Sequence, residues 1–482
     1  MEYKITGCKP EKLFHFFEDI SAIPRGSGNE KGLSDYLVKF AKDRNLWVYQ
    51  DESNNVIIKK EGSEGAKDKA PVMLQGHIDM VCDKLAGVEH DFEKDGLDLI
   101  VKDGVLYANG TTLGADNGVA VALMMTVLDD KELEHPPVEC VFTTSEEIGL
   151  NGAQALDKSQ ITARTMINMD SEEEGVATVS CAGGLRVQLT RKIERVQAEG
   201  TLVQIKAEGL LGGHSGTERQ NANLLMARMA DHLLKNTKGL LVNFAGGTKD
   251  NAITRECEMS LIYADSAEAQ KAEKLACDLA EVFADEITSF EPDFSCEIAV
   301  TEGQSAMAVQ EEDAKAFVSL MRLAPNGIYR RNIKMNGFVV VSSNMGVVRT
   351  EEDYIMVAVS PRSSVASLQE DTKSRFALLA ETFGFEIEYS GEYPGWSYAE
   401  ESKIRDLFVE SYRDLFGSEL RLEAIHAGLE CGLFSEAIPG LDAIAVGPTL
   451  NNVHTPDENA PLDSLERFYE LLKDVLSRLA RA

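Results

Sequence analysis

The sequence predicts an α/β fold that is interrupted by an inserted α+β domain. Between about residues 11 and 185, amphipathic helical segments alternate with short apolar strands, which is the pattern of a sheet covered by helices. Beyond this region, apolar residues recur at every second position, which favours antiparallel strands. Towards the C-terminus, helix and apolar strand return. We therefore predict one domain built from residues 1–185 and 393–482, with a second domain, residues 186–392, inserted between the two segments.

The first segment contains helices with one apolar face and a strand that is apolar on both faces. The run APVMLQGHIDMV, residues 70–81, is almost continuously apolar, as is typical of a parallel strand buried between two layers. The predicted helices cover residues 12–23, 32–45 and 118–130, and the predicted strands cover residues 47–52, 54–62, 70–81, 138–147 and 164–173. This alternation indicates the α/β part of the fold.

The inserted domain and the last segment differ in their periodicity. In the insert, alternating apolar residues predict strands at 185–194, 201–209, 257–265, 296–303 and 338–360, and helical spacing predicts helices that include 223–236 and 313–324. In the last segment, we predict helices at 402–416 and 464–479 and apolar strands at 420–428 and 441–448. Because the alternation of helices and apolar strands returns in the last segment, the pattern supports a single α/β domain made of two separated segments.

Length and charge limit the classes of partner. The chain has 482 residues, enough for at least two domains, and 44% of them are hydrophobic, so a sizeable core can form. With 48 basic and 80 acidic residues, the formal net charge is −32. Because like charges repel, we expect neither nucleic acid nor an anionic membrane as a partner. The acidity is interpreted as a solvated surface.

Targeting signals and cysteine pairs are not apparent. The N-terminal residues lack a basic region followed by an apolar run, and the sequence has no stretch of about 18 apolar residues, so we expect neither a signal peptide nor a spanning helix. The eight cysteines are scattered without a C-x-x-C pair, which is typical of free thiols and excludes a cysteine-based zinc site. We therefore expect a cytoplasmic protein.

Residues that can bind metal recur where predicted strands end. His77 and Asp79 end the 70–81 run, Glu146 and Glu147 end the strand VECVFTTSEE, and Asp170 ends MINMD. In open α/β sheets, ligands bind beyond the carboxyl ends of the strands, so these three segments can deliver side chains to one edge. His77 and Asp79 project to the same side of an extended segment, so Asp79 can orient the imidazole. Adjacent Glu146 and Glu147 point different ways, so one can bind metal while the other acts as a general base.

Two loop residues complete the candidate set. Asp116 lies in the glycine-rich turn TTLGADNG, and His454 lies in NNVHTPDE shortly before the last helix. Taken singly, Asp116 is best interpreted as a turn or helix N-cap residue, and His454 as a loop histidine. Together with carboxylates at successive strand ends, they instead indicate a metal site.

The charges of these residue types suit two divalent cations. Two such ions bring about +4, and the carboxylates of Asp116, Glu147 and Asp170 bring about −3. The remaining charge of about +1 would be cancelled by a bound hydroxide. Nitrogen and oxygen ligands without thiolate favour zinc, with manganese or cobalt as alternatives. The sequence therefore predicts two divalent metal ions per chain.

The motifs GHIDMV, GADNG, TTSEEIG, INMDSEE and HTPDE together resemble the co-catalytic zinc peptidases of the aminoacylase and carboxypeptidase clan. Within this clan, the chain is most similar to the aminoacyl-histidine dipeptidase (Xaa-His dipeptidase, carnosinase-like) family, in motif order and over essentially the whole chain. The resemblance implies a mixed sheet flanked by helices, with the inserted α+β domain as a lid.

Carried over motif by motif, the resemblance assigns the metal ligands and the catalytic groups. His77 and Asp170 would each hold one metal together with a bridging Asp116, whereas Glu147 and His454 would hold the other. Glu146 would be the general base toward a metal-bridging water, and Asp79 would be the orienting carboxylate. The family also implies a cis peptide bond after Asp116.

The resemblance also assigns substrate-binding residues in the lid and in one loop of the last segment. His214 in GLLGGHSG would stabilise the tetrahedral oxyanion. Without the resemblance, His214 is best interpreted as a solvent-exposed histidine in a turn. Asn251 in DNAITRE and Arg362 in SPRSS would bind substrate, Arg362 through the C-terminal carboxylate that a guanidinium pairs well. Gly428 in HAGLECGLF would lie where the backbone meets the peptide. His426, in the same loop, is left as either a core residue or a support for the site.

The predicted activity is hydrolysis of dipeptides, including Xaa-His dipeptides such as carnosine, with a small peptide as the partner. An aminoacylase or another amide hydrolase on the same metals is the first alternative. A catalytically inactive binding protein is the second, and the complete set of candidate ligands with Glu146 argues against it. The resemblance allows a homodimer, although no apolar stripe in the sequence marks an interface.

Overall fold

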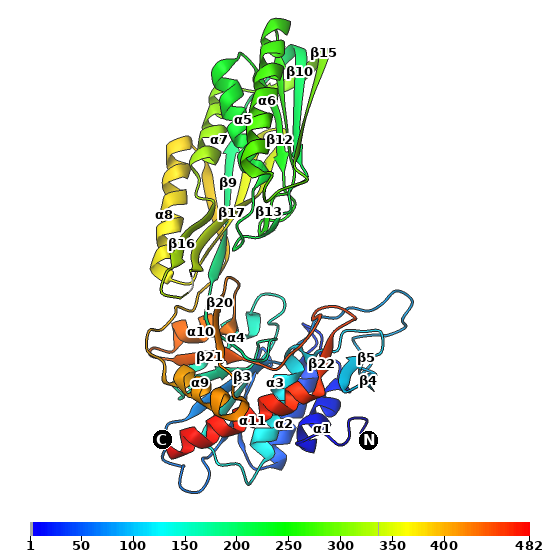
Figure 1. Ribbon diagram of the computed structural model, residues 1–482, viewed down its shortest axis with the longest axis vertical. Coiled ribbons are helices and arrows are strands. Elements are labelled where there is room, and N and C mark those ends of the chain that lie inside the picture. Colours follow the sequence, from blue (N-terminus) through cyan, green and yellow to red (C-terminus); the bar gives the residue numbers. More distant parts are fainter. Residues whose placement is uncertain (1–2, 336) are drawn as a thin grey trace. The chain divides into compact units, whose positions relative to one another are not determined.

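The computed structural model of the protein describes residues 3–335 and 337–482 (Figure 1). The chain divides into two compact units. Unit 1 comprises Met1–Cys181, Trp396–Ile425 and Leu429–Ala482, and unit 2 comprises Ala182–Gly395 and His426–Gly428. Each unit buries a hydrophobic core of its own. The predicted α/β class is confirmed, since helices and a mixed sheet make up unit 1.

The centre of unit 1 is an eight-stranded mixed sheet in the order β1-β2-β6-β3-β7-β21-β8-β20. Its strands are β1 (Trp47–Gln50), β2 (Val56–Lys60), β3 (Val72–His77), β6 (Val138–Thr143), β7 (Thr165–Asn168), β8 (Val176–Cys181), β20 (Arg421–Ile425) and β21 (Asp442–Val446). β3 runs parallel to both of its neighbours, β6 and β7. Because the three strands run parallel, their carboxyl ends meet at one edge of the sheet. All six residues of β3 are buried, as the apolar run predicts.

Helices cover this sheet, and one of them is buried almost all round. The helices of unit 1 are α1 (Glu11–Ser21), α2 (Lys31–Asp43), α3 (Ala115–Asp129), α4 (Asn151–Ala155), η1 (Lys158–Gln160), α9 (Lys403–Phe416), α10 (Glu430–Ala437) and α11 (Leu462–Arg481). α3 is apolar on every face and packs against β3 and α1. A separate small sheet joins β4 (Leu99–Lys102), β5 (Val105–Ala108) and β22 (Asn459–Pro461).

Unit 2 is a nine-stranded antiparallel sheet with helices along one face (Figure 1). Its strands are β9 (Gly183–Lys192), β10 (Arg195–Glu208), β12 (Leu240–Gly246), β14 (Cys257–Tyr263), β15 (Ser295–Val309), β16 (Gly327–Asn332), β17 (Phe338–Thr350), β18 (Tyr354–Ser363) and β19 (Glu386–Tyr393). The helices are α5 (Ala222–Asn236), α6 (Ser266–Ile287), α7 (Glu311–Leu323) and α8 (Ala366–Phe383), and a short two-stranded sheet pairs β11 (Gly213–His214) with β13 (Ala252–Ile253).

The sheet of unit 2 contains the same βαββαβ arrangement twice. The first copy is β10-α5-β12-β14-α6-β15, with its strands in the order β15-β10-β14-β12. The second is β9-α7-β17-β18-α8-β19, with its strands in the corresponding order β19-β9-β18-β17. The first copy is inserted between β9 and α7 of the second, and the copies meet edge to edge where Gly246 of β12 pairs with Val348 of β17. The sequence patterns did not reveal this repeat.

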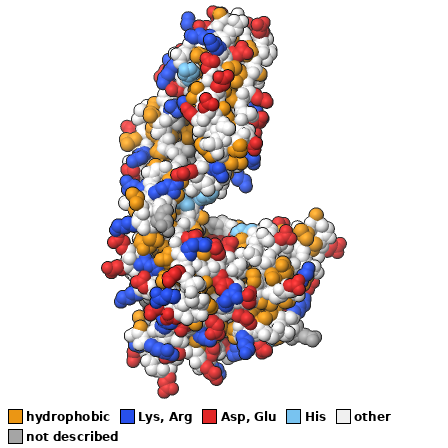
Figure 2. All heavy atoms as spheres, viewed as in Figure 1, with side chains coloured by type: hydrophobic (Ala, Val, Ile, Leu, Met, Phe, Trp, Pro, Cys, Tyr) orange, Lys and Arg blue, Asp and Glu red, His pale blue; other side chains and the backbone are white. Residues whose placement is uncertain are grey.

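Two further features bear on the sequence analysis. No helix in the described ranges 3–335 and 337–482 is both long and apolar enough to cross a membrane. On the face seen in Figure 2, acidic side chains are scattered among basic ones rather than gathered in one patch. The sequence analysis assigned no helix to the residues that form the long helices α6 and α8. In α8 only four side chains, Gln369, Thr372, Phe376 and Ala380, are buried, so its apolar stripe is narrow.

Candidate metal centre

The edge formed by β6, β3 and β7 carries most of the predicted ligands. His77 is the last residue of β3, Glu146 and Glu147 follow β6, and Asp170 follows β7. Because β3 is parallel to both neighbours, these residues leave the sheet on the same side. His77 is buried, with 1% of its surface exposed. The topology therefore brings together residues that lie as many as 93 positions apart.

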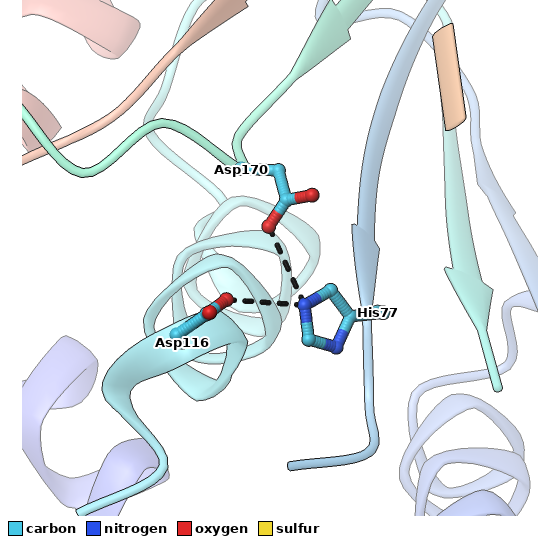
Figure 3. A group of neighbouring side chains, drawn as sticks. All are labelled: His77, Asp116 and Asp170. Atoms are coloured by element: carbon cyan, nitrogen blue, oxygen red, sulfur yellow. Dashed lines mark hydrogen bonds and ion pairs between the residues drawn. The ribbon is translucent and has the colours of Figure 1, made fainter. Parts of the chain in front are cut away.

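Asp116 stands at the centre of the cluster and faces two groups of donors. Its Oδ1 lies 3.1 Å from Nε2 of His77, which is also 3.4 Å from Oδ1 of Asp170 (Figure 3). Its Oδ2 lies 3.1 Å from Nε2 of His454, which is 2.9 Å from Oε1 of Glu147. Within each of the groups His77–Asp116–Asp170 and Asp116–Glu147–His454, one donor atom per residue lies within 4.8 Å of the others. One carboxylate is thus shared by two groups, each of the kind that holds a metal ion.

The chain reaches Asp116 through an unusual turn at the start of α3. Gly114 has a φ of 63°, and Asp116 and Asn117 have non-helical backbone angles although they lie within the helix bounds. The peptide bond between Asp116 and Asn117 is cis, as the family resemblance implied. The Asn117 side chain donates a hydrogen bond of 2.7 Å to Oδ1 of Asp170. Asn117 was not selected from the sequence, because an asparagine after Asp116 in GADNG is a common turn residue.

Asp79 is buried and links two of the segments that carry candidate ligands. Its Oδ1 lies 3.3 Å from Nδ1 of His77 and accepts the backbone N–H of Glu146 at 3.1 Å. Its Oδ2 accepts the hydroxyl of Ser27 at 2.8 Å and the backbone N–H of Glu147 at 3.3 Å. Burial alone would raise the pKa of Asp79, but its hydrogen bonds from His77, Ser27 and Glu146 lower it. An ionised carboxylate is therefore available to orient the imidazole.

The orientation of His77 indicates what its other nitrogen can bind. Nδ1 has only acceptors nearby, the backbone oxygen of Asp79 at 3.1 Å and its carboxylate, so Nδ1 carries a hydrogen. Nε2 faces the carboxylates of Asp116 and Asp170, and can do so only when it carries a proton or when a cation lies between them. Burial alone would lower the pKa of His77, but Asp170 and Asp116 raise it well above its ordinary value.

Crowded acidic groups are the dominant electrostatic feature of the site. Burial, followed by the charges of Asp170 and other carboxylates, raises the pKa of Glu146 to about 9, against the opposite effect of His77. Burial, with the charge of Asp116, raises the pKa of Asp170 to about 6. Hydrogen bonds to Asp116 and Glu147 raise the pKa of His454 to about 10. Divalent cations would supply the missing positive charge, so this nitrogen and oxygen donor set fits them.

A layer of buried polar side chains lies behind the candidate ligands. Oε2 of Glu430, the first residue of α10, accepts hydrogen bonds from Nε2 of Gln75 and from the hydroxyl of Thr143, the latter at 2.8 Å. Oε1 of Gln75 in turn accepts Nδ2 of Asn168 at 2.6 Å. Gln75 and Asn168 stand two residues before His77 and Asp170, so one network joins β3, β6 and β7 just below the site. Sequence reasoning missed Glu430, although it lies in the quoted loop HAGLECGLF.

In unit 2, His214 has an unpaired donor. Its Nδ1 accepts the backbone N–H of Gly216 at 3.1 Å, so the hydrogen of the neutral ring is on Nε2. This Nε2 is buried and has no hydrogen-bond partner in the part of the chain that the structure describes. Burial, followed by the positive charge of Arg362, lowers the pKa of His214 and favours the neutral ring. The residue therefore offers one free N–H donor.

The other lid candidates lie at several places in unit 2. Arg362 on β18 donates from Nη1 to the backbone oxygen of His426 at 3.1 Å, and its buried Nε has no partner among residues 3–335 and 337–482. The His426 ring lies 6.0 Å from the His214 ring, so these three residues form one polar cluster. Asn251 is exposed and precedes Ala252, which pairs with His214.

The last of these candidates, Gly428, packs against an aromatic ring. A Cβ added to Gly428 would stand 2.7 Å from the ring of Tyr393, so this position admits no side chain without a shift of that ring.

Comparison with known proteins places this geometry in context. Residues 73–478 match the model of peptidase family M20/M25/M40. The chain is 33% identical, over 99% of both chains, to the cytosol non-specific dipeptidase of Escherichia coli K12. It is similar to the crystal structure of aminoacylhistidine dipeptidase from Vibrio alginolyticus, with a TM-score of 0.94 and 34% identity over 98% of both chains. A tripeptidase from Staphylococcus aureus, with 16% identity over 98% of this chain and 100% of its own, shares the fold at a TM-score of 0.56.

Proposed function

The chain belongs to peptidase family M20/M25/M40, and from this premise we propose that it is a metal-dependent dipeptidase. The observation that carries the proposal is the position of Asp116, whose two carboxylate oxygens face two separate groups of metal-binding side chains. Two cations held a few ångströms apart are one established arrangement for metal-assisted hydrolysis. The relatives named as dipeptidases cover 99% and 98% of the chain and support a dipeptide substrate.

We propose that the metal ions are zinc, with manganese and cobalt as alternatives. His77, Asp116 and Asp170 would hold one ion, and Asp116, Glu147 and His454 the other. When bound, such ions supply Lewis acidity toward the scissile carbonyl and toward water. The ring and carboxylate ligands suit all three metals, and the pairing of Nδ1 of His77 with Asp79 supports binding through Nε2.

In this proposal, Glu146 is the general base. Its backbone N–H is bound to Asp79, so its side chain belongs to the same fixed loop as the ligand Glu147. The Glu146 carboxylate would take the proton from the attacking water and then deliver it to the leaving amine. Burial, followed by the charges of neighbouring carboxylates, raises its pKa to about 9, and cations beside it would lower that value toward neutrality.

We assign substrate binding to the cluster in unit 2. The free Nε2–H of His214 would donate to the oxygen that becomes negatively charged during the reaction, a contact that is stronger in the transition state than in the substrate. Arg362 retains an unpaired donor for the C-terminal carboxylate of the dipeptide. Asn251 and Gly428 would contact the peptide, as the family resemblance implies.

The proposed substrates are dipeptides that include Xaa-His dipeptides such as carnosine, and the proposed location is the cytoplasm. The name of the relative from Vibrio alginolyticus supports the histidine-containing substrates, and that of the relative from Escherichia coli supports the cytoplasm. The homodimer allowed by the family resemblance stays a prediction.

One variant tests the mechanism. We expect Glu146→Ala to lower turnover of dipeptides by at least about 100-fold, because the base is lost, while metal analysis still finds two ions per chain. Glu89→Ala, which changes an exposed loop glutamate, is the control and should behave as the wild type. Near-normal turnover by Glu146→Ala would refute the role of Glu146.

A substrate panel tests the specificity. It contains Xaa-His dipeptides, dipeptides without histidine and N-acyl amino acids, and hydrolysis is measured for each after loading with zinc or manganese. We expect dipeptides to be the best substrates. Preferential hydrolysis of N-acyl amino acids would favour the aminoacylase alternative, and no hydrolysis together with no bound metal would favour a binding protein.

A further inference from the structure

Two oppositely charged side chains, Arg25 and Glu458, are buried beside the turn that carries Asp116. Only 2% of the surface of each is exposed, and neither belongs to the metal-binding groups described above. Buried charges are unfavourable unless hydrogen bonds compensate the loss of water. The partners of Arg25 and Glu458 therefore indicate why unit 1 retains them.

Glu458 binds four consecutive backbone N–H groups. Its Oε2 accepts those of Leu113 at 2.7 Å and Gly114 at 2.8 Å. Its Oε1 accepts those of Ala115 at 2.8 Å and Asp116 at 3.2 Å. These groups lead into α3, where backbone N–H groups have no helical partner and carry partial positive charge. An ionised carboxylate satisfies all four at once.

Arg25 binds the carbonyl side of the same turn. Its Nη2 donates to the backbone oxygen of Gly114, and its Nη1 donates to the backbone oxygens of Ile78 at 3.1 Å and Asp79 at 3.3 Å. Gly114 therefore has its N–H held by Glu458 and its carbonyl held by Arg25. A Cβ on Gly114 would stand 2.5 Å from Nη2 of Arg25, so only glycine leaves room for the guanidinium.

The two side chains connect three segments that carry ligands. Arg25 binds the residues directly after His77, both side chains bind the turn before Asp116, and Glu458 stands four residues after His454 in the chain. We propose that Arg25 and Glu458 are positioning residues, which hold the Asp116 carboxylate between His77 and His454 so that two cations can share it. This inference rests on the dinuclear site of the proposed function.

The bonding pattern predicts that even an isosteric change is damaging. In Glu458→Gln, one carboxylate oxygen becomes an amide NH₂, which cannot accept hydrogen bonds. Two of the four N–H groups are then left unsatisfied and face another donor, so the turn must move. We expect the affinity for cations to fall by about 10- to 100-fold, as is usual when a residue that supports metal ligands is lost.

Glu139 on β6 offers a matched control. It is also buried, with 3% of its surface exposed, and accepts the backbone N–H groups of Thr162 at 2.9 Å and Ala163 at 3.0 Å. Its other partners are the hydroxyl of Thr162 and the ammonium of Lys59. None of these partners adjoins a proposed ligand. Glu139→Gln therefore removes a comparable buried acceptor without touching the Asp116 turn.

The test is a titration of the metal-free full chain with cobalt(II) alone, followed by its visible absorption, with circular dichroism at the same temperature to establish folding. We expect two ions per chain in the wild type and in Glu139→Gln, with affinities within about threefold of each other. Glu458→Gln should lose about 10- to 100-fold in affinity for at least one ion. If Glu458→Gln does not fold, the titration is done with Arg25→Lys instead. Lysine keeps the positive charge but lacks the forked donors of arginine, so the affinity for cobalt(II) should fall about tenfold.

The outcomes separate the two proposals. Wild-type affinity in a folded Glu458→Gln, or in Arg25→Lys when Glu458→Gln does not fold, would overturn the positioning role and leave the dinuclear site intact. An equal loss in Glu139→Gln would also overturn it, because the effect would then be general destabilisation. A wild-type chain that binds fewer than two cobalt ions would instead refute the dinuclear site on which the inference rests.

Discussion

The carboxylate of Asp79 lies 3.3 Å from Nδ1 of His77 and also accepts backbone hydrogen bonds from the loop after β6. The same buried group thus sets the orientation of the imidazole and the position of the segment that carries Glu146 and Glu147. Substitution of Asp79 should therefore damage the site more than substitution of a carboxylate that only orients a ligand.

The first prediction follows from this arrangement. Asp79→Asn places an amide NH₂ against backbone N–H groups or against Nδ1 of His77, so we expect metal affinity and turnover to fall by about 10- to 100-fold. Metal analysis and dipeptide hydrolysis measure the effect. Asp265→Asn, which changes the aspartate that caps α6 in unit 2, is the control and should leave both values near the wild type, because asparagine also caps helices. Equal affinities in the two variants would contradict this role of Asp79.

The second prediction concerns Arg362. If its unpaired donor binds the C-terminal carboxylate, Arg362→Ala should raise KM for a dipeptide by about 10- to 100-fold, the loss of roughly 1.5–3 kcal/mol expected for a charged hydrogen bond. For the same dipeptide with an amidated C-terminus, KM should be nearly the same in Arg362→Ala as in the wild type, because this substrate has no carboxylate to lose. A similar rise in KM for both substrates would argue against recognition of the carboxylate by Arg362.

The third prediction separates hydrogen bonding from charge at Glu430. Of the two carboxylate oxygens of Glu430, Oε2 accepts both hydrogen bonds, and Oε1 has no partner among the described residues. The single oxygen of a glutamine side chain can therefore replace Oε2. We expect Glu430→Gln to keep metal affinity within about threefold of the wild type. Glu430→Ala leaves Gln75 and Thr143 without their acceptor, and should lower the free energy of unfolding by roughly 2–4 kcal/mol. Chemical denaturation and cobalt titration measure both effects, and equal damage by the two variants would show that charge is required.

The fourth prediction is a pH dependence of stability in unit 2. Burial, followed by the charge of Arg362, lowers the pKa of His426 to about 3, whereas an unfolded histidine has a pKa of about 6.5. The unfolded chain therefore takes up a proton as the pH falls below 6.5, while the folded chain does not. The contribution of His426 to the free energy of unfolding is therefore fully present above pH 6.5 and is lost progressively as the pH falls toward 3.

Between pH 7 and 5, the wild type should lose about 1–2 kcal/mol more stability than His426→Gln. Urea unfolding followed by circular dichroism at several pH values measures the difference. His232→Gln, on α5 of the same unit, is the control and should keep the wild-type slope. A slope in His426→Gln equal to that of the wild type would contradict the prediction.

Most of the candidate site could be proposed from the sequence because several of its residues stand where predicted strands end, and the others lie in motifs that resemble those of a known family. His77, Glu147 and Asp170 each follow an apolar strand, and Asp116 lies in a glycine-rich turn. Glu458 and Glu430 have no such signal, since their partners are backbone N–H groups or side chains that lie 287 to 355 positions away. Both stand inside motifs that the sequence analysis quoted, yet a glutamate in a loop is ordinarily solvated.

The sequence by itself determined the α/β class, and it predicted an interrupted first domain and a set of candidate ligands, because periodicity and residue chemistry are local properties. Tertiary structure alone decided that β6, β3 and β7 lie side by side, that Asp116 faces two groups of donors, and that Arg25 and Glu458 hold its turn. It also revealed the repeated βαββαβ arrangement of unit 2, one copy of which interrupts the other. Strand order and buried charge pairing depend on contacts between distant residues, which no local pattern records.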